Sequence, residues 1–181
     1  MVILFGLAGS GKSTQGQILA KKRGMTWLSV GQVLRDTGEF DEILKAGKLV
    51  DDDMVIKLMN REIRKIRDQG GDVILDGFPR DEYQAKWVAK NLSNEISRAV
   101  FIEVPKEELW ARIEARGRAD DTREAIERRF GIVEQNIYAI LEILEKSGVE
   151  IRQVSGTGTI EEVTERLDKE LFQMRLPKFM V

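Results

Sequence analysis

A glycine-rich segment near the start of the chain constrains the fold more than any other feature. Residues 6–14 have the sequence Gly-Leu-Ala-Gly-Ser-Gly-Lys-Ser-Thr and follow the apolar run from Val2 to Phe5. The strand-like pattern before these glycines and the helix-like pattern after them predict a strand-to-helix turn. Glycine lets the backbone approach a ligand closely, and the N–H groups at a helix N-terminus attract anions. The segment therefore predicts a phosphate-binding loop in an α/β fold.

The spacing within this loop gives separate tasks to its last residues. Four residues separate Gly6 from Gly11, and Lys12 and Ser13 follow at once. In loops of this pattern the lysine reaches the β- and γ-phosphates of a nucleotide, and the hydroxyl after it contacts Mg²⁺. The alternative is an ordinary Gly/Ser turn between a strand and a helix. Because such a turn needs only one or two glycines, three glycines with a lysine and a hydroxyl favour phosphate binding.

Two missing residue types narrow the chemistry. The chain contains no Cys and no His. This excludes thiol nucleophiles, Ser–His relays and zinc sites built from imidazole or thiolate. Phosphoryl transfer fits the residues that remain, because it needs positioning and charge neutralisation, which arginine and lysine supply.

Length and charge bound the class of protein. With 181 residues and 42% hydrophobic content, the chain is predicted to form one domain. Lys and Arg number 29 against 31 Asp and Glu, a net charge of −2, so no general positive field favours a nucleic-acid or membrane-surface partner. No apolar run approaches the roughly 18 residues of a membrane span. We expect a cytoplasmic protein and a monomer, with no nucleic-acid or membrane partner.

Strand-like runs alternate with amphipathic helical segments along the chain. The strands are expected at residues 2–5, 26–28, 72–75, 99–104 and 149–154. The helices are expected at about 13–22, 31–37, 52–68, 81–91, 106–115, 122–147 and 159–174. This alternation predicts a three-layer α/β/α fold with a five-stranded parallel sheet.

A second motif lies at residues 73–80, where an apolar strand ends in Asp76. A carboxylate at the end of such a strand resembles a Walker-B element, which holds Mg²⁺ through water beside the phosphate-binding loop. The alternative, an Asp that caps the next turn, is less favoured in a chain that also has such a loop. Gly77 and Pro79 then place Arg80 as a bidentate phosphate ligand.

Arginines concentrate in a third segment, which contains Arg112, Arg116 and Arg118 and is followed by Arg129. Residues four apart share one face of a helix, and Gly117 allows the chain to turn after them. A solvated surface neutralised by nearby glutamates (Glu108, Glu114 and Glu127) is the alternative. The preceding phosphate motifs favour an anion-binding cluster, and adjacency alone suggests that Asp120 and Asp121 orient its guanidinium groups.

Together these motifs resemble the adenylate kinase family of nucleoside monophosphate kinases over nearly the whole chain. The matching segments, in order, are the phosphate-binding loop, Leu28 to Arg35, Gly47 to Val50, Asp76 to Arg80 with Gln84, and Arg118 to Asp121 with Arg129. The resemblance implies reversible transfer of the γ-phosphoryl group from Mg·ATP to a nucleoside monophosphate. It implies a core of 1–29, 70–111 and 122–181, a small monophosphate-binding segment at about 30–60, and a very short lid at about 112–121.

The resemblance also implies a role for each matching position. ATP would contact Gly9, Ser10, Gly11, Lys12, Ser13, Thr14, Arg116 and Gly158. AMP would contact Val30, Arg35, Lys48, Leu49, Val50, Gly77, Phe78, Pro79, Arg80, Gln84, Arg118 and Arg129. The catalytic residues would be Lys12, Arg80, Arg112, Arg118 and Arg129. Mg²⁺ would be held by Ser13 and by Asp76.

Several departures from the family pattern bear on specificity. Val30 stands where adenylate kinases usually have a base-binding Thr, whereas Gln84 matches their usual Gln. The Gln amide suits adenine but in its flipped orientation would suit guanine. Both residues suit a purine better than a pyrimidine, so AMP is the expected substrate. Ser13 replaces the usual Gly, so we expect the hydroxyl that contacts Mg²⁺ to move from Thr14 to Ser13.

Three other functions compete with this interpretation. A UMP/CMP or other monophosphate kinase of the same fold would share the phosphate-binding motifs. A regulatory P-loop ATPase would need no second nucleotide site, so the segment from Asp76 to Arg80 counts against it. A nucleic-acid-binding module is suggested only by basic residues at 21–23 and by the arginine cluster. The basic residues at 21–23 are better explained by a position at a helix C-terminus, where positive charge is favourable.

Overall fold

The computed structural model describes residues 1–172 except 47, 119 and 120. Its five strands form one sheet in the order β2-β3-β1-β4-β5, and every pairing is parallel. The strands are β1 (Val2–Phe5), β2 (Thr26–Ser29), β3 (Val73–Asp76), β4 (Arg98–Glu103) and β5 (Glu150–Ser155). Each lies within one or two residues of its predicted range, so the predicted parallel sheet is confirmed.

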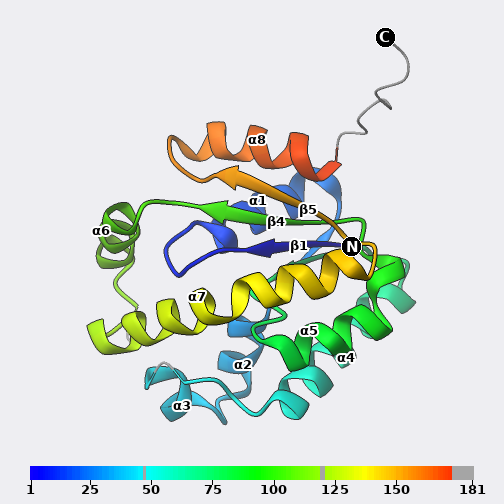
Figure 1. Ribbon diagram of the computed structural model, residues 1–181, viewed down its shortest axis with the longest axis horizontal. Coiled ribbons are helices and arrows are strands. Elements are labelled where there is room, and N and C mark those ends of the chain that lie inside the picture. The colour runs from blue at the N-terminus through cyan, green and yellow to red at the C-terminus, as the bar shows by residue number, and fades with distance from the viewer. Residues whose placement is uncertain (47, 119–120, 173–181) are drawn as a thin grey trace.

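Helices cover both faces of this sheet, as Figure 1 shows. On one face lie α1 (Lys12–Arg23) and α8 (Ile160–Phe172). On the other lie α4 (Asp52–Asp68), α5 (Glu82–Asn91) and α7 (Arg123–Lys146). The remaining helices are α2 (Val30–Thr37), α3 (Asp41–Lys45) and α6 (Lys106–Arg116). The three-layer prediction is confirmed; the expected positions 173 and 174 of the last helix lie outside the described residues.

Successive residues of the central strand, β1, pack into two separate hydrophobic cores. Ile3 and Phe5 pack in a cluster with side chains of α4, α5 and α7. Val2 and Leu4 pack in a cluster with side chains of α1 and α8. Side chains alternate between the faces of a strand, and a strand covered on both faces is apolar throughout. The unbroken run from Val2 to Phe5 is therefore the sequence of a doubly covered strand.

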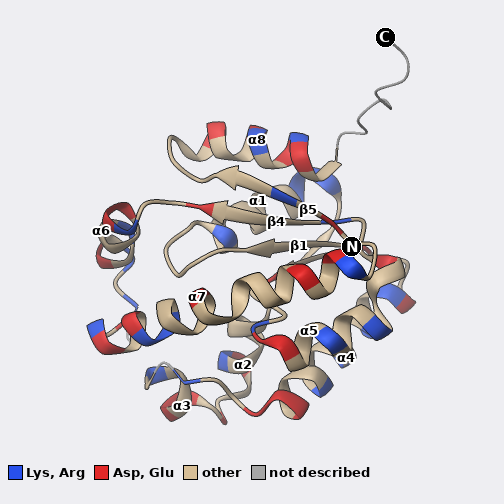
Figure 2. Cartoon of the chain, in the orientation of Figure 1, with Lys and Arg blue, Asp and Glu red and all other residues tan. Residues whose placement is uncertain are grey.

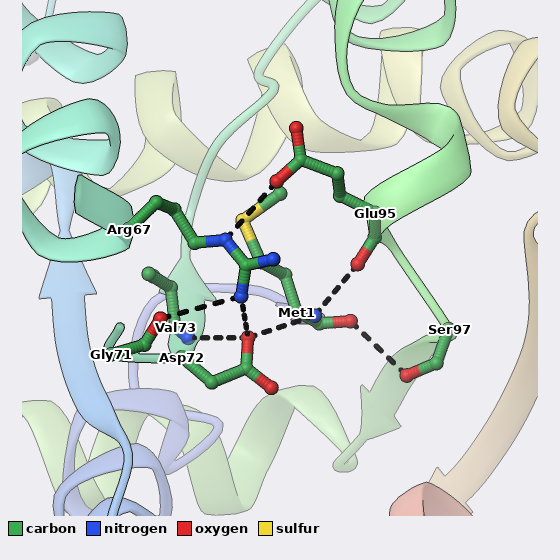
Figure 3. A network of polar contacts seen from close by, with 7 residues as sticks. All are labelled: Met1, Arg67, Gly71, Asp72, Val73, Glu95 and Ser97. Atoms are coloured by element: carbon green, nitrogen blue, oxygen red, sulfur yellow. Dashed lines mark hydrogen bonds and ion pairs between the residues drawn. The ribbon is translucent and has the colours of Figure 1, made fainter. Parts of the chain in front are cut away.

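A polar network joins several elements at the amino end of the sheet, as shown in Figure 3. The Met1 ammonium donates to the Glu95 carbonyl at 2.7 Å and pairs with Asp72 Oδ1 at 3.0 Å. Arg67, at the end of α4, pairs with Asp72 at 3.2 Å and with Glu95 at 3.1 Å. Burial alone would raise the pKa of Asp72, but the ammonium, the Val73 N–H and Arg67 hold that pKa below its usual value.

Charged residues of both signs are interspersed along the outer helices, whereas the strands are largely uncharged (Figure 2). Among the helices that the structure describes, none is both long enough and apolar enough to cross a membrane.

Candidate active site

A cavity of about 530 Å³ opens at the carboxyl ends of the strands. Parallel strands bring their following loops to this edge, which is where α/β proteins bind ligands. Of the predicted site residues, the cavity is lined by Gly9, Ser10, Gly11, Lys12, Ser13, Thr14, Arg35, Lys48, Leu49, Asp76, Gly77, Pro79, Arg80, Arg112, Arg116, Arg118, Arg129 and Gly158. The structure thus brings together residues from seven separate stretches of the sequence.

The phosphate-binding loop connects β1 to α1. Gly11 precedes the helix with φ +91°, a left-handed conformation that glycine adopts readily, and no described side chain caps the helix. At Gly9 a Cβ atom would lie 2.8 Å from the Leu109 carbonyl oxygen, so glycine lets α6 pack against the loop. The first N–H groups of α1 therefore remain available for an anion.

Lys12 lies within the loop that precedes it. Its Nζ donates to the carbonyl oxygens of Gly6 at 2.7 Å and Leu7 at 2.8 Å. Burial lowers the pKa of Lys12 to about 8, against the opposing effect of the Asp76 carboxylate. Neighbouring arginines lower the same pKa further because they are positively charged. A bound phosphate group would place negative charge beside this lysine and so favour its charged form.

Ser13 and Asp76 meet beside the loop. The Ser13 hydroxyl donates to Asp76 Oδ2 at 2.7 Å, and Asp76 is only 3% exposed. The Trp27 indole N–H donates to the same carboxylate oxygen at 3.2 Å. The register of β1 with β3 places Asp76 opposite Leu4, just before the loop. Hydroxyl and carboxylate oxygens suit Mg²⁺, which takes one or two protein ligands together with substrate phosphates. No group of three or more acidic, His or Cys side chains that could hold a metal occurs within the described ranges.

Arg35 and Arg80 converge on one point of the backbone. A Cβ atom at Gly31 would lie 3.4 Å from a guanidinium nitrogen of each arginine, so both groups lie beside this glycine. Arg80 Nε donates to the Gly77 carbonyl at 2.9 Å, which fixes its side chain. Burial lowers the pKa of Arg80 to about 10, and the charges of Arg129 and Arg35 act in the same direction. Two partly buried guanidinium groups so close together form a site for an anion such as phosphate.

The arginines of α6 and α7 also line the cavity. Arg112 donates to Glu108 at 2.6 Å and to the Gly156 carbonyl at 2.8 Å. Arg116 pairs with Asp121 at 2.7 Å, and Arg129 pairs with the same carboxylate at 3.1 Å. Asp121 therefore contacts two guanidinium groups, as its position in the sequence suggested. Asp120 lies outside the described residues.

Four predicted site residues do not line the cavity: Val30, Val50, Phe78 and Gln84. The side chain of Gln84 is buried, its Oε1 accepts from the Arg80 N–H at 2.9 Å, and its Nε2 donates to Asp52 Oδ1 at 2.8 Å. These two contacts select one orientation of the amide. Gly47, part of the predicted monophosphate-binding motif, lies outside the described residues.

Sequence reasoning missed Asp52 as a partner of Gln84. The acidic run at 51–53 indicates only negative charge at a helix N-terminus. The N-terminus of α5 lies beside that of α4, a proximity that no local pattern reveals. A role for Trp27 was missed as well, because a Trp in a strand is most often a packing residue.

Comparison with known proteins places this site in a family. The adenylate kinase family model matches residues 4–149, which is most of the chain. The chain belongs to the adenylate kinase family. The matched region contains the phosphate-binding loop, the Asp76 to Arg80 segment and the arginines from Arg112 to Arg129.

Relatives of this adenylate kinase family member carry two different names. An adenylate kinase of Thermus thermophilus is 36% identical over 181 residues, covering 92% of this chain and 94% of that protein. An adenylate kinase of Synechococcus sp. is 31% identical over 181 residues, covering 94% of this chain and 97% of that protein. UMP-CMP kinase 1 of Oryza sativa subsp. japonica is 35% identical over 176 residues, covering 91% of this chain and 71% of that protein.

Proposed function

We propose that this nucleoside monophosphate kinase transfers the γ-phosphoryl group of Mg·ATP reversibly to AMP, giving two ADP. One observation carries the proposal: two separate sets of cationic groups face the same cavity. The phosphate-binding loop with Lys12 forms one set, and the Arg35 and Arg80 pair beside Gly31 forms the other. A protein that only hydrolyses a nucleotide triphosphate needs the first set alone.

The first set is proposed to hold the donor. The backbone from Gly9 to Thr14 and the Lys12 ammonium would bind the ATP phosphates, and Arg116 would contact the same nucleotide. Gly158 would border the adenine, since it lines the same cavity between β5 and α8. In this arrangement the γ-phosphoryl group would face the other cationic groups that line the cavity.

The second set is proposed to hold the acceptor. Arg35 and Arg80 would bind the phosphate of AMP, and Lys48, Leu49, Gly77 and Pro79 would form the walls around it. Val30, Val50, Phe78 and Gln84 are buried next to this region, so they would support those walls unless binding exposes them. The monophosphate-binding segment is proposed at about 30–60, the very short lid at about 112–121, and the core elsewhere.

Arginines between the two sets are proposed to neutralise the charge that spreads over the transferred group. Arg112, Arg118 and Arg129 line the cavity together with Lys12. Phosphoryl transfer depends on such positioning and charge neutralisation, and one arginine can contribute about 10³-fold in rate. Excluding water from this space would favour transfer over hydrolysis.

Ser13 and Asp76 are proposed to hold the Mg²⁺ that accompanies ATP, because a hydroxyl and a carboxylate lie 2.7 Å apart at the cavity wall. When bound there, Mg²⁺ would neutralise phosphate charge. The protein's part is to keep these two oxygens in place beside the phosphate-binding loop. The cytoplasmic location, the monomeric state and the lack of nucleic-acid and membrane partners stay predictions.

A panel of AMP, GMP, CMP and UMP with Mg·ATP tests the choice of acceptor through kcat/KM in a coupled assay. AMP is expected to be the best substrate. A tenfold preference for CMP or UMP would instead assign the chain to the pyrimidine kinases of this family, a possibility favoured by the likeness to a UMP-CMP kinase. ADP formation that does not require any monophosphate would support a regulatory ATPase.

A further inference from the structure

The indole of Trp27 lies against the carboxylate proposed to bind the metal. Trp27 is in β2, which pairs with β3 so that Ser29 lies opposite Asp76. The indole N–H donates to Asp76 Oδ2 at 3.2 Å, and the Ser13 hydroxyl donates to the same atom at 2.7 Å. Asp76 Oδ1 accepts no hydrogen bond from a described residue, which leaves this oxygen available to a ligand.

A glycine in the facing helix makes room for the indole. Gly16 is buried in the interior of α1, where glycine is less favourable than alanine. A Cβ atom at Gly16 would lie 2.5 Å from Cδ1 and 2.8 Å from Nε1 of Trp27. Glycine at this position therefore has a structural reason: it lets the N–H edge of the ring reach Asp76. The phosphate-binding motif itself does not require this glycine.

We propose that Trp27 is a positioning residue for the metal-binding carboxylate. Its N–H, admitted by Gly16, occupies one oxygen of Asp76 together with Ser13 and so leaves the other oxygen oriented toward the Mg²⁺ of the nucleotide substrate. Outer partners of this kind fix the orientation of a metal ligand, and their loss weakens metal binding. The inference rests on the proposed role of Asp76 in holding Mg²⁺.

Two substitutions separate hydrogen bonding from packing. The five-membered ring of indole superimposes on imidazole, with His Nε2 at the place of Trp Nε1. Trp27→His therefore keeps the donor on a smaller ring, whereas Trp27→Phe keeps a six-membered ring and loses the donor. The measurement is the Mg²⁺ concentration that gives half the maximal rate at fixed ATP and AMP.

Trp27→Phe is expected to raise this Mg²⁺ concentration about tenfold while leaving kcat at saturating Mg²⁺ unchanged. Trp27→His is expected to restore most of the original Mg²⁺ dependence. If packing alone mattered, the smaller imidazole would be the worse of the two. An unchanged Mg²⁺ dependence in Trp27→Phe, or a larger defect in Trp27→His, would overturn the proposal.

A second variant reaches the same contact from the other side. Gly16→Ala improves the helix propensity of α1 but is expected to displace the indole and to raise the Mg²⁺ requirement in the same direction. The matched control is Trp87→Phe, which removes an indole N–H from α5, where the ring lies 6.4 Å from that of Phe78. This control is expected to keep the original Mg²⁺ dependence.

An NMR measurement without nucleotide provides a readout other than activity. The Trp27 indole N–H resonance, identified by its absence in Trp27→Phe, is expected to move upfield in Asp76→Asn, where a neutral amide replaces the carboxylate. No movement would contradict the contact. Asp76→Asn also separates two failures. If it leaves the Mg²⁺ dependence unchanged, the proposed metal site is wrong; if only Asp76→Asn alters that dependence, the role of Trp27 alone is wrong.

Discussion

Single charged side chains decide what this site can bind. Lys12 and Arg80 each have a pKa below the usual value because burial disfavours their charged forms. Asp76 is a buried carboxylate at the same cavity, and its charge opposes both of these shifts. A cavity with this excess of buried positive charge becomes more stable when anions occupy it. Phosphate groups at both ends of the cavity would provide this compensation.

Replacing Arg80 by Lys tests the proposed acceptor half of the site. Lysine keeps the charge but loses the planar fork that binds phosphate through two hydrogen bonds. Arg80→Lys is expected to lower kcat/KM for AMP by about 10³-fold while leaving the affinity for ATP nearly unchanged. Steady-state kinetics and calorimetry with ATP measure the two effects.

The matched control for this change is Arg123→Lys, at an exposed arginine that pairs with Glu127. It should keep the activity of the original protein. Equal losses toward ATP and AMP in Arg80→Lys would contradict an acceptor-specific role for Arg80.

The limits of sequence reasoning are clearest at Gln84. Its position in the motif indicated a base contact, but the two hydrogen bonds of its amide depend on the Arg80 backbone and on Asp52, 32 positions earlier. Such a contact follows from how two helices meet, which local patterns do not encode. Lys12, Arg80 and the arginines of α6 were predictable because their motifs fix residue type and spacing together.

At the scale of elements, the N-termini of α4 and α5 bring acidic residues together. Asp51 caps α4 by accepting from the Met54 N–H, and Asp81 caps α5 by accepting from the Gln84 N–H. Burial, together with the neighbouring Asp52 carboxylate, raises the pKa of Asp81 to about 6. The cap is favourable for the helix, but its charge is unfavourable beside a second carboxylate.

Asp81→Asn is expected to stabilise the protein near pH 7.5. A carboxyl whose pKa is raised by folding contributes stability at low pH, and this contribution is lost as the pH rises through about 6. Asn keeps the cap without the charge, so the gain is about 1 kcal/mol after allowance for solvent screening, or about 2–4 °C in Tm. Thermal denaturation at pH 5 and pH 7.5 measures it.

The gain from Asp81→Asn should fall to about half at pH 5, which lies between the ordinary carboxyl pKa of the unfolded chain and the raised pKa of about 6 in the folded protein. Asp51→Asn, which makes the same change at the exposed cap of α4, is the control and should give no comparable gain in stability at pH 7.5. An equal gain at both pH values would mean that the charge of Asp81 is not responsible.

Element boundaries were predicted well where the patterns are long. The helix expected at 52–68 has those bounds in the structure, because an acidic N-terminus and an extended apolar periodicity mark it. The short α3 and the 3₁₀ turn at Ser93–Glu95 were not predicted, since such short segments show no periodicity. The short α3 matters for the site because Leu44, which lies in it, lines the cavity.

For the whole molecule, the carboxyl and amino ends of the strands form two edges of the sheet that have different roles. The carboxyl ends of the strands open on the cavity, whereas the amino ends are joined by the network of Met1, Arg67, Asp72 and Glu95 (Figure 3). In a parallel sheet all strands point in the same direction, so the loops that follow them lie together at one end of the strands. Stability and function should therefore respond separately to changes at the two edges.

Asp72→Asn tests this separation. The change removes the carboxylate that pairs with the Met1 ammonium and Arg67, and it is expected to cost about 1 kcal/mol because the side chain is partly exposed. A pKa lowered by folding contributes stability above the usual value, and this is lost as the pH falls through the lowered pKa. The loss of stability should therefore be present at pH 7 and shrink in acid.

Denaturant titration at several pH values measures the stability of Asp72→Asn, and a coupled assay measures kcat/KM. Activity at 25 °C should equal that of the original protein. A fall in kcat/KM with unchanged stability would contradict the separation of the two edges.

Contacts between α7 and α3 link the proposed monophosphate-binding segment to the helix that carries Arg129. Arg128 Nη1 donates to the Ala46 carbonyl at 2.5 Å, and Arg129 Nη2 donates to the Leu44 carbonyl at 2.9 Å. Arg129 also pairs with Asp121, so it connects this segment to the proposed lid. Arg128 makes its contact outside the cavity lining. Its hydrogen bond can therefore influence how closely the acceptor half is held without touching a nucleotide.

Arg128→Ala is expected to raise KM for AMP about fivefold, the value of one hydrogen bond of about 1 kcal/mol, with kcat nearly unchanged. The reason is that the acceptor segment would spend less time against α7, whereas the groups that perform the transfer would stay in place. Arg123→Ala removes an exposed arginine from the same helix and serves as the control. Steady-state kinetics with AMP varied at saturating ATP measures the effect. A fall in kcat with unchanged KM would instead mean that Arg128 acts on the transfer step, and an unchanged KM and kcat would mean that the contact with Ala46 does not hold the segment.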